Sequence, residues 1–106
     1  MAARARELAA YLAAVPDDEA GWEELSILRV GLDDPAGAAQ ALARLSTLRP
    51  NDADVLVAWA VAIAMREQSF AGEAETLLRR ALAIDPEHQR AGAMMRHLKQ
   101  RRAPDS

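Results

Sequence analysis

Few side chains in this 106-residue sequence are of types that catalyse reactions or bind metals. There is no cysteine, which excludes disulfides, thiolate zinc sites and cysteine nucleophiles. The only histidines, His88 and His97, lie nine residues apart with no adjacent set of metal ligands. His88 follows Pro86-Glu87 at an expected helix start, where we expect an exposed side chain.

Met94 and His97 are spaced so that they share one side of a helix, and a haem iron can bind Met and His together. Because a Met near a His on a helix usually contributes to packing, we interpret Met94 as a core residue. A featureless visible spectrum after addition of hemin would exclude haem binding. Carboxylate pairs such as Asp17-Asp18 fall at helix starts, where capping accounts for them, and no CxxCH, GxGxxG or Walker motif is present. We therefore expect a non-enzymatic protein with no cofactor and no metal site.

Composition and charge favour packed helices. Hydrophobic residues make up 51% of the chain and aromatic residues only 4%, and alanine alone supplies 25 residues. Alanine has the highest helix propensity, and no stretch alternates over strand length, so we expect an all-α fold. The net charge of −3 argues against a nucleic-acid partner. Residues 1–54 hold 5 Arg/Lys and 10 Asp/Glu, whereas residues 55–106 hold 8 and 6, and we attribute this asymmetry to helix ends.

The length suits a single domain covering residues 1–106. The longest uncharged run, Val55 to Met65, has 11 residues, and a membrane-spanning helix needs about 20. We expect this run to form a buried helix and no membrane span. No signal peptide is visible, because Arg4, Arg6 and Glu7 interrupt the first apolar run.

Three prolines, Pro16, Pro50 and Pro86, divide the chain into similar units of 34 and 36 residues. Proline cannot continue a helix, and it disfavours helical geometry in the residue before it. Acidic or amide residues follow each proline and favour a new helix start. We expect turns near Gly31 and Ser69 inside the units. The predicted helices cover about 3–14, 20–31, 35–48, 53–67, 71–84 and 88–101.

The two units share a pattern of apolar positions. It reads Trp22, Leu25, Ala38, Leu42 and Leu45 in the first unit, and Leu56, Trp59, Ala74, Leu78 and Ala81 in the second. The match requires two extra residues near Gln68-Ser69. We interpret both tryptophans as core residues. A 34-residue period with an aromatic, a small residue and a closing proline resembles the tetratricopeptide repeat (TPR).

This resemblance implies helical hairpins stacked as a short right-handed solenoid of about six helices, because one helix pair cannot bury its own apolar face. It implies an N-terminal half repeat at 3–14 and a first complete repeat at 19–50. A second complete repeat, with the two-residue turn expansion, would cover 53–86, and a C-terminal capping helix would cover 88–101.

In TPR proteins the first helix of each pair lines a concave groove that binds a peptide or helix. The positions that this resemblance implies are Glu23, Ile27, Val30, Val57, Val61, Ala64, Met65, Ala93, His97 and Arg101. The clamp that holds acidic C-terminal tails in some members is absent here, because Glu23, Glu24 and Ile27 occupy its places. An apolar groove of this kind favours an amphipathic helix or an apolar extended segment as partner. Alternatively, a neighbouring helix or a second copy in a homodimer fills it.

A narrower resemblance is to the periplasmic TPR subunit of bacterial c-type cytochrome maturation (the CcmI, CycH and NrfG type). It is carried by YLAAVPDDEAGW, RPNDADVLVAWAVAIAM and FAGEAETLLRRALAIDPEHQRA, with the expanded turn between the last two. The resemblance implies that the groove binds apocytochrome c, chiefly its C-terminal helix, in the periplasm. Those proteins usually carry N-terminal membrane helices and a further repeat, so we expect an excised domain or a short soluble relative. The alternative is a generic bacterial scaffold, in the cytoplasm, with an unknown partner.

Overall fold

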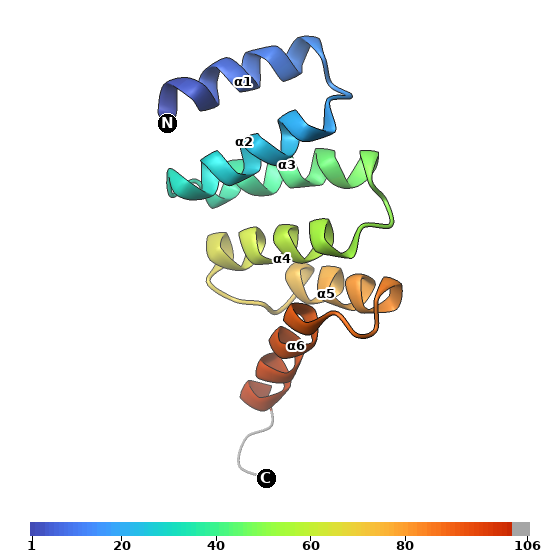
Figure 1. Ribbon diagram of the computed structural model, residues 1–106. Coiled ribbons are helices and arrows are strands. Elements are labelled where there is room, and N and C mark those ends of the chain that lie inside the picture. The colour runs from blue at the N-terminus through green and yellow to red at the C-terminus, as the bar shows by residue number, and fades with distance from the viewer. Residues whose placement is uncertain (103–106) are drawn as a thin grey trace.

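The computed structural model describes residues 1–102, which form six α-helices and no strand (Figure 1). The all-α prediction is confirmed over this range, and each observed helix end lies within two residues of its expected place. The helices are α1 (Ala2–Ala14), α2 (Glu19–Gly31), α3 (Pro35–Leu48), α4 (Ala53–Glu67), α5 (Glu73–Ile84) and α6 (Gln89–Arg102).

Helices α1, α3 and α5 end in the same way. Each is followed by one residue in a non-helical conformation and then by a proline. The φ and ψ angles of that residue are −128° and 72° at Val15, −129° and 70° at Arg49, and −133° and 90° at Asp85. The proline ring disfavours helical geometry in the residue before it, so each helix stops there. The prolines therefore set three of the helix ends directly.

Aspartate side chains cap the three helices in the middle of the chain. Asp18 accepts a hydrogen bond from the Gly21 N–H (3.0 Å) at the start of α2, and Asp34 accepts one from the Gly37 N–H (2.9 Å) at the start of α3. Asp52 caps α4 by accepting from two backbone N–H groups. Each carboxylate satisfies donors that have no partner inside the helix.

Left-handed residues form the turns at the ends of α2 and α4. The turn after α2 contains Asp33 (φ 59°), and the turn after α4 contains Gln68 (φ 57°) and Gly72 (φ 81°). Gly31 is the last residue of α2, not the centre of the turn. The first connection has three residues and the second has five, so the two extra residues lie in the α4–α5 connection. Helix α5 begins at Glu73 and not at 71, because Gly72 has a backbone conformation that a right-handed helix cannot contain.

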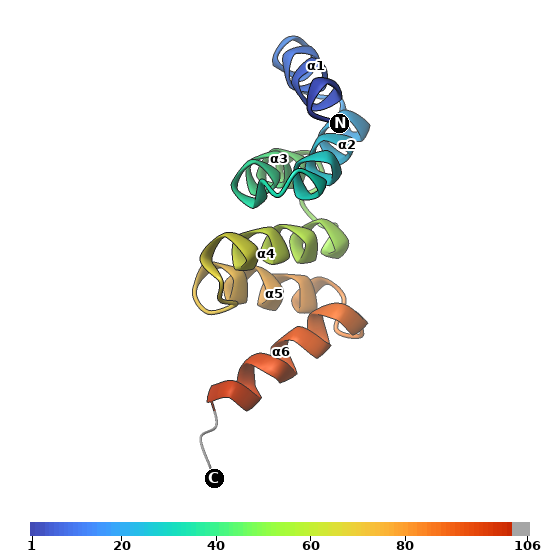
Figure 2. The ribbon, with the colours of Figure 1, turned by 90° about the vertical axis from the view of Figure 1, so that its left-hand side faces the viewer.

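The helices pack mainly on their neighbours in the chain, α2 on α3, α3 on α4 and α4 on α5. The molecule is elongated, with extents of 52 × 26 × 18 Å, and α1 and α6 lie at opposite ends (Figures 1 and 2). In Figure 2, α2 lies beside α3, and α6 diverges from α5 along its length. Within residues 1–102, no helix combines the length and apolar character needed to cross a membrane.

The core consists of two clusters of buried side chains. The larger lies between α3, α4, α5 and α6, and the smaller between α1, α2 and α3. Trp22 is half-buried and packs against both, and Trp59 packs against the larger one. The Trp22 indole also donates a hydrogen bond to the Pro16 carbonyl (2.8 Å). Both tryptophans thus contribute to the core, as predicted.

Candidate partner-binding groove

Two adjoining cavities open along α2, α4 and α6. The first, of about 250 Å³, lies between α2 and α4 and is lined by Ser26, Ile27, Val30, Leu42, Ala58, Val61, Ala62, Met65 and Arg90. The second, of about 350 Å³, lies between α4 and α6 and is lined by Val61, Ala64, Met65, Gln68, Ser69, Phe70, His97, Leu98 and Arg101. Val61 and Met65 line both cavities. We refer to the two cavities together as the groove.

The groove gathers seven of the ten residues that the sequence indicated. They are Ile27, Val30, Val61, Ala64, Met65, His97 and Arg101. They come from three helices that are separated in the sequence by other helices. The repeat pattern assigned these residues to equivalent positions in successive helices, and the structure places them along one groove.

The other three residues lie elsewhere. Val57 is completely buried and belongs to the larger core cluster, so it offers no surface to a partner. Glu23 lies beside Arg49, with 3.4 Å between Oε2 and Nη1, and lines neither cavity. Ala93 is exposed on α6 and also lines neither cavity.

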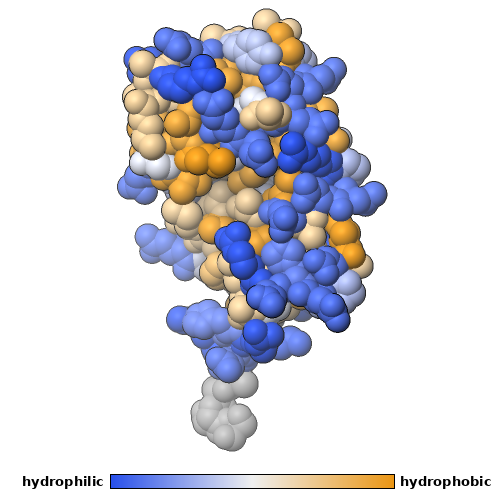
Figure 3. All heavy atoms as spheres, viewed as in Figure 1, coloured by the Kyte–Doolittle hydropathy of each residue, from blue (hydrophilic) through white to orange (hydrophobic). Residues whose placement is uncertain are grey.

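Three large apolar residues of the groove have exposed side chains. Ile27 is 65% exposed, Val30 43% and Met65 42%. Figure 3 shows hydrophobic atoms across the middle of this face and hydrophilic atoms over the end formed by α6. Contiguous exposed apolar surface of this kind commonly marks a site of protein–protein contact.

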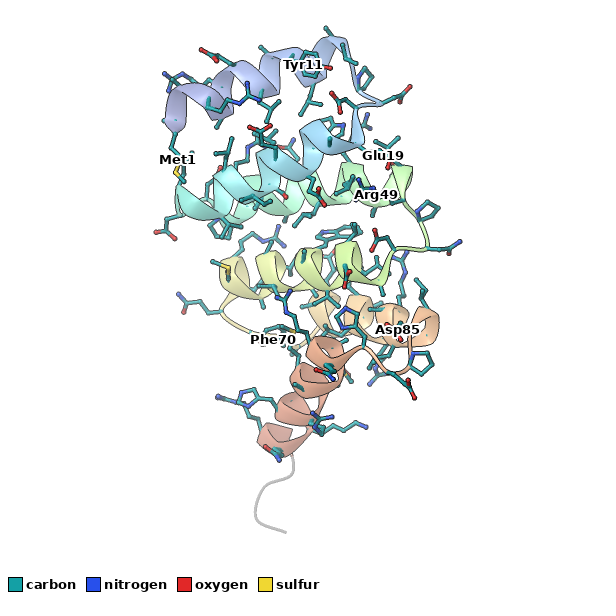
Figure 4. The ribbon with its side chains drawn as sticks, in the orientation of Figure 1. Met1, Tyr11, Glu19, Arg49, Phe70 and Asp85 are labelled. Carbon is teal, nitrogen blue, oxygen red and sulfur yellow. The ribbon has the colours of Figure 1, made fainter. Side chains whose placement is uncertain are left out.

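The expanded α4–α5 connection builds one wall of the groove. Gln68, Ser69 and Phe70 all line the α4–α6 cavity, and Phe70 also packs against the larger core cluster. Figure 4 shows Phe70 beside α6. The sequence pattern located the two extra residues but did not identify this connection as a groove wall. The sequence feature that could have indicated this wall is the position of Phe70, a lone aromatic residue in a turn next to the repeat expansion.

The acidic residues of α2 are already paired. Arg49 lies 2.7 Å from Glu19 and 3.4 Å from Glu23, and Glu19 and Arg49 are neighbours in Figure 4. Arg4 of α1 donates to both Glu24 carboxylate oxygens, at 2.8 and 3.0 Å. This hydrogen-bonded guanidinium lowers the pKa of Glu24 below its usual range. These carboxylates therefore stabilise contacts between helices.

His88 is a structural residue, and the expectation of an exposed side chain is wrong. Its side chain is only 10% exposed. Nδ1 accepts a hydrogen bond from the Ala91 N–H (3.2 Å) at the start of α6, and Nε2 lies 2.7 Å from Asp54 Oδ1. Since Nδ1 accepts, Nε2 carries the proton and donates to the carboxylate. Nδ1 thus caps the start of α6, and Nε2 joins this cap to Asp54 of α4.

The Met–His pair on α6 divides between core and surface. Met94 is half-buried against the larger core cluster, whereas His97 is exposed and lines the α4–α6 cavity. Among residues 1–102, no three His, Cys, Asp or Glu side chains come together as a candidate metal site. The contact of Met94 with the larger core cluster agrees with the packing role that the sequence indicated.

No model of a known protein family matches the chain, and no curated protein matches it either.

Proposed function

We propose that this chain is a non-enzymatic TPR-type adaptor whose groove binds a helix of another protein. The observation that carries the proposal is the pair of adjoining cavities that share Val61 and Met65. A helix lying across α4 could place one apolar side chain in each cavity. Burial of exposed groups such as Ile27 would supply the binding free energy.

Three features support the TPR interpretation. Helix ends recur before Pro16, Pro50 and Pro86; the first spacing is the 34 residues typical of this repeat, and the second is 36 because of the two extra residues in the α4–α5 connection. Neighbouring helices in the chain pack on one another, as helical hairpins must. Most groove residues come from α2, α4 and α6, which are the first helices of successive pairs in this arrangement.

The preferred partner is the C-terminal amphipathic helix of apocytochrome c, which would place the protein in c-type cytochrome maturation in the periplasm. Two features support this choice. The expanded connection, which contributes Phe70 to the groove, is the more specific part of the narrower sequence resemblance. The groove also lacks the basic clamp for acidic tails, because Glu23 and Glu24 pair with arginines at the places concerned.

A peptide titration tests the proposal. Peptides from C-terminal helices of apocytochromes c should bind with micromolar affinity, and an acidic pentapeptide tail should not bind. Val61→Glu would bring a charge against the apolar face of the partner, which should cost about 2 kcal/mol, or about 30-fold in affinity. Val15→Glu is the matched control, because Val15 is 41% exposed and lies outside the groove. Equal affinity of both variants, with far-UV circular dichroism unchanged, would contradict the groove assignment.

A second candidate is self-association through the same surface. The observation that favours it is the 65% exposure of Ile27 beside exposed Val30 and Met65. Sedimentation equilibrium would then show a dimer, and Ile27→Glu should return it to a monomer. A monomer at all concentrations tested would remove this candidate and leave the groove free for another protein.

A further inference from the structure

We propose that the helix bound in the groove carries a row of acidic residues along one flank of its apolar face, and that Arg90, His97 and Arg101 of α6 bind this row. The inference rests on the proposed function and specifies the chemistry of the partner. It makes the partner an acidic amphipathic helix, oriented so that its charged flank faces α6.

The three side chains form one stripe along α6. They are spaced by seven and four residues, which places them on the same side of a helix. The stripe spans eleven residues, or about 16 Å at 1.5 Å per residue. Arg90 lines the α2–α4 cavity, and His97 and Arg101 line the α4–α6 cavity. The stripe therefore follows the groove over both cavities.

The charge of this stripe is not balanced by carboxylates within residues 1–102. Helix α6 contains no Asp or Glu, and neither Arg90 nor Arg101 has a carboxylate within 4.0 Å in the described part of the chain. The α2 side adds no carboxylate to the lining of the groove, and Glu23 and Glu24 of α2, which lie outside both cavities, are paired with arginines. The groove thus presents positive charge on its α6 side alone. A partner with carboxylates along that side is complementary to it.

Backbone hydrogen bonding makes a helix a better partner for the groove than an extended segment. All the elements that form it are helices, whose backbone groups are bonded internally, except for the connection around Ser69. Apart from Ser26, the non-charged lining of the α2–α4 cavity is entirely apolar. An extended chain would leave its backbone N–H and C=O groups without partners there, whereas a helix satisfies its own.

The shape and surrounding charge favour a protein over an anionic membrane or a nucleic acid. The stripe lies beside cavities of about 250 and 350 Å³, which suit single side chains. A flat lipid surface or a phosphate backbone would fill neither cavity. The whole chain also has a net charge of −3, which disfavours a polyanion at long range.

Two designed helical peptides test the inference. Both have the same apolar face, and the flank carries three Glu in one and three Lys in the other, spaced by seven and four residues. At low salt the Glu peptide should bind at least about tenfold more tightly, and the difference should shrink as salt screens the charges. Arg90→Glu combined with Arg101→Glu should reverse the preference. Arg96→Glu is the matched control, because Arg96 is exposed on α6 and lines neither cavity.

The possible results separate the two proposals. If both peptides bind equally well and the variants change nothing, the charged stripe is wrong while the groove itself stands. If neither peptide binds and the protein is folded, the proposed function fails and the acidic flank fails with it. Vesicles of phosphatidylglycerol and phosphatidylcholine provide the third arm. Vesicle binding that depends on Arg101, without binding of the Glu peptide, would assign the stripe to lipid and overturn the inference.

Discussion

Trp22 should be the side chain whose loss weakens the whole stack of helices most clearly. Among residues 1–102 it is the one partly buried side chain that packs against both core clusters, and its indole N–H donates to the Pro16 carbonyl (2.8 Å). The smaller cluster lies between α1, α2 and α3, and the larger one between α3, α4, α5 and α6. Trp22→Ala would remove the side chain common to both.

The magnitude follows from its burial and its hydrogen bond. Replacing a fully buried Trp by Ala costs about 3–5 kcal/mol. Because Trp22 is only half-buried, we expect about 2 kcal/mol for the lost packing and about 1 kcal/mol for the lost hydrogen bond. Arg44 lies 5.7 Å from the ring centroid but is exposed, so it adds at most about 0.5 kcal/mol. The expected loss in unfolding free energy is therefore about 3 kcal/mol.

Urea denaturation followed by far-UV circular dichroism measures this loss, and Trp59 remains as a fluorescent probe. Trp22→Phe is the matched control, since it keeps an aromatic ring and removes the N–H. It should cost about 1 kcal/mol. A loss below about 1 kcal/mol for Trp22→Ala would refute the view that this side chain joins the two clusters. A loss in Trp22→Phe equal to that in Trp22→Ala would instead assign the whole effect to the hydrogen bond.

Three further predictions concern single contacts. The Tyr11 hydroxyl and backbone N–H groups lower the pKa of Asp18, so the unfolding free energy that Asp18 contributes is present above about pH 4 and falls as the carboxylate is protonated. Acid titration of the unfolding free energy should therefore be shallower in Asp18→Asn, and an unchanged slope would contradict this. His88→Ala removes the cap of α6 and the hydrogen bond to Asp54, and should lower the unfolding free energy by about 1–2 kcal/mol. Backbone hydrogen exchange should become faster in α6 first. An equal increase in all helices would contradict this local role. Gly72→Ala should lower the unfolding free energy by about 1 kcal/mol, because φ is 81° at this position, although the added Cβ would have no atom within 4 Å. An unchanged melting temperature in thermal denaturation would show that the connection relaxes.

Most of the helix pattern could be predicted because its signals are local. A proline acts on the residue before it, and an aspartate cap acts on N–H groups two or three residues ahead, so Pro50 and Asp52 define the boundary between α3 and α4 without any distant contact. The start of α5 was predicted two residues early. Its sequence offered no side-chain cap, and the boundary depends on the positive φ of Gly72.

The groove was predictable only in part, because exposure depends on how neighbouring helices diverge. Val57, Val61 and Ala64 follow one stripe of α4 and look equivalent in the sequence. In the structure Val57 is completely buried, Ala64 is 6% exposed and lines the α4–α6 cavity alone, and Val61 lines both cavities. The repeat pattern gave the stripe correctly but not the place along it where the helices separate.

The all-α fold, the six helices of residues 1–102, most of their boundaries and the position of the two extra residues could be predicted from the sequence, since each follows from propensities and caps within a few residues. Which of these residues lie together depends on how the helices pack. This packing joined Val61 to Ile27 and His97 through two cavities, placed Phe70 as a wall and brought Arg90 to the groove. The physical reason is that a helical stripe fixes which side chains share a face, while the packing angles between helices decide whether that face is covered or open.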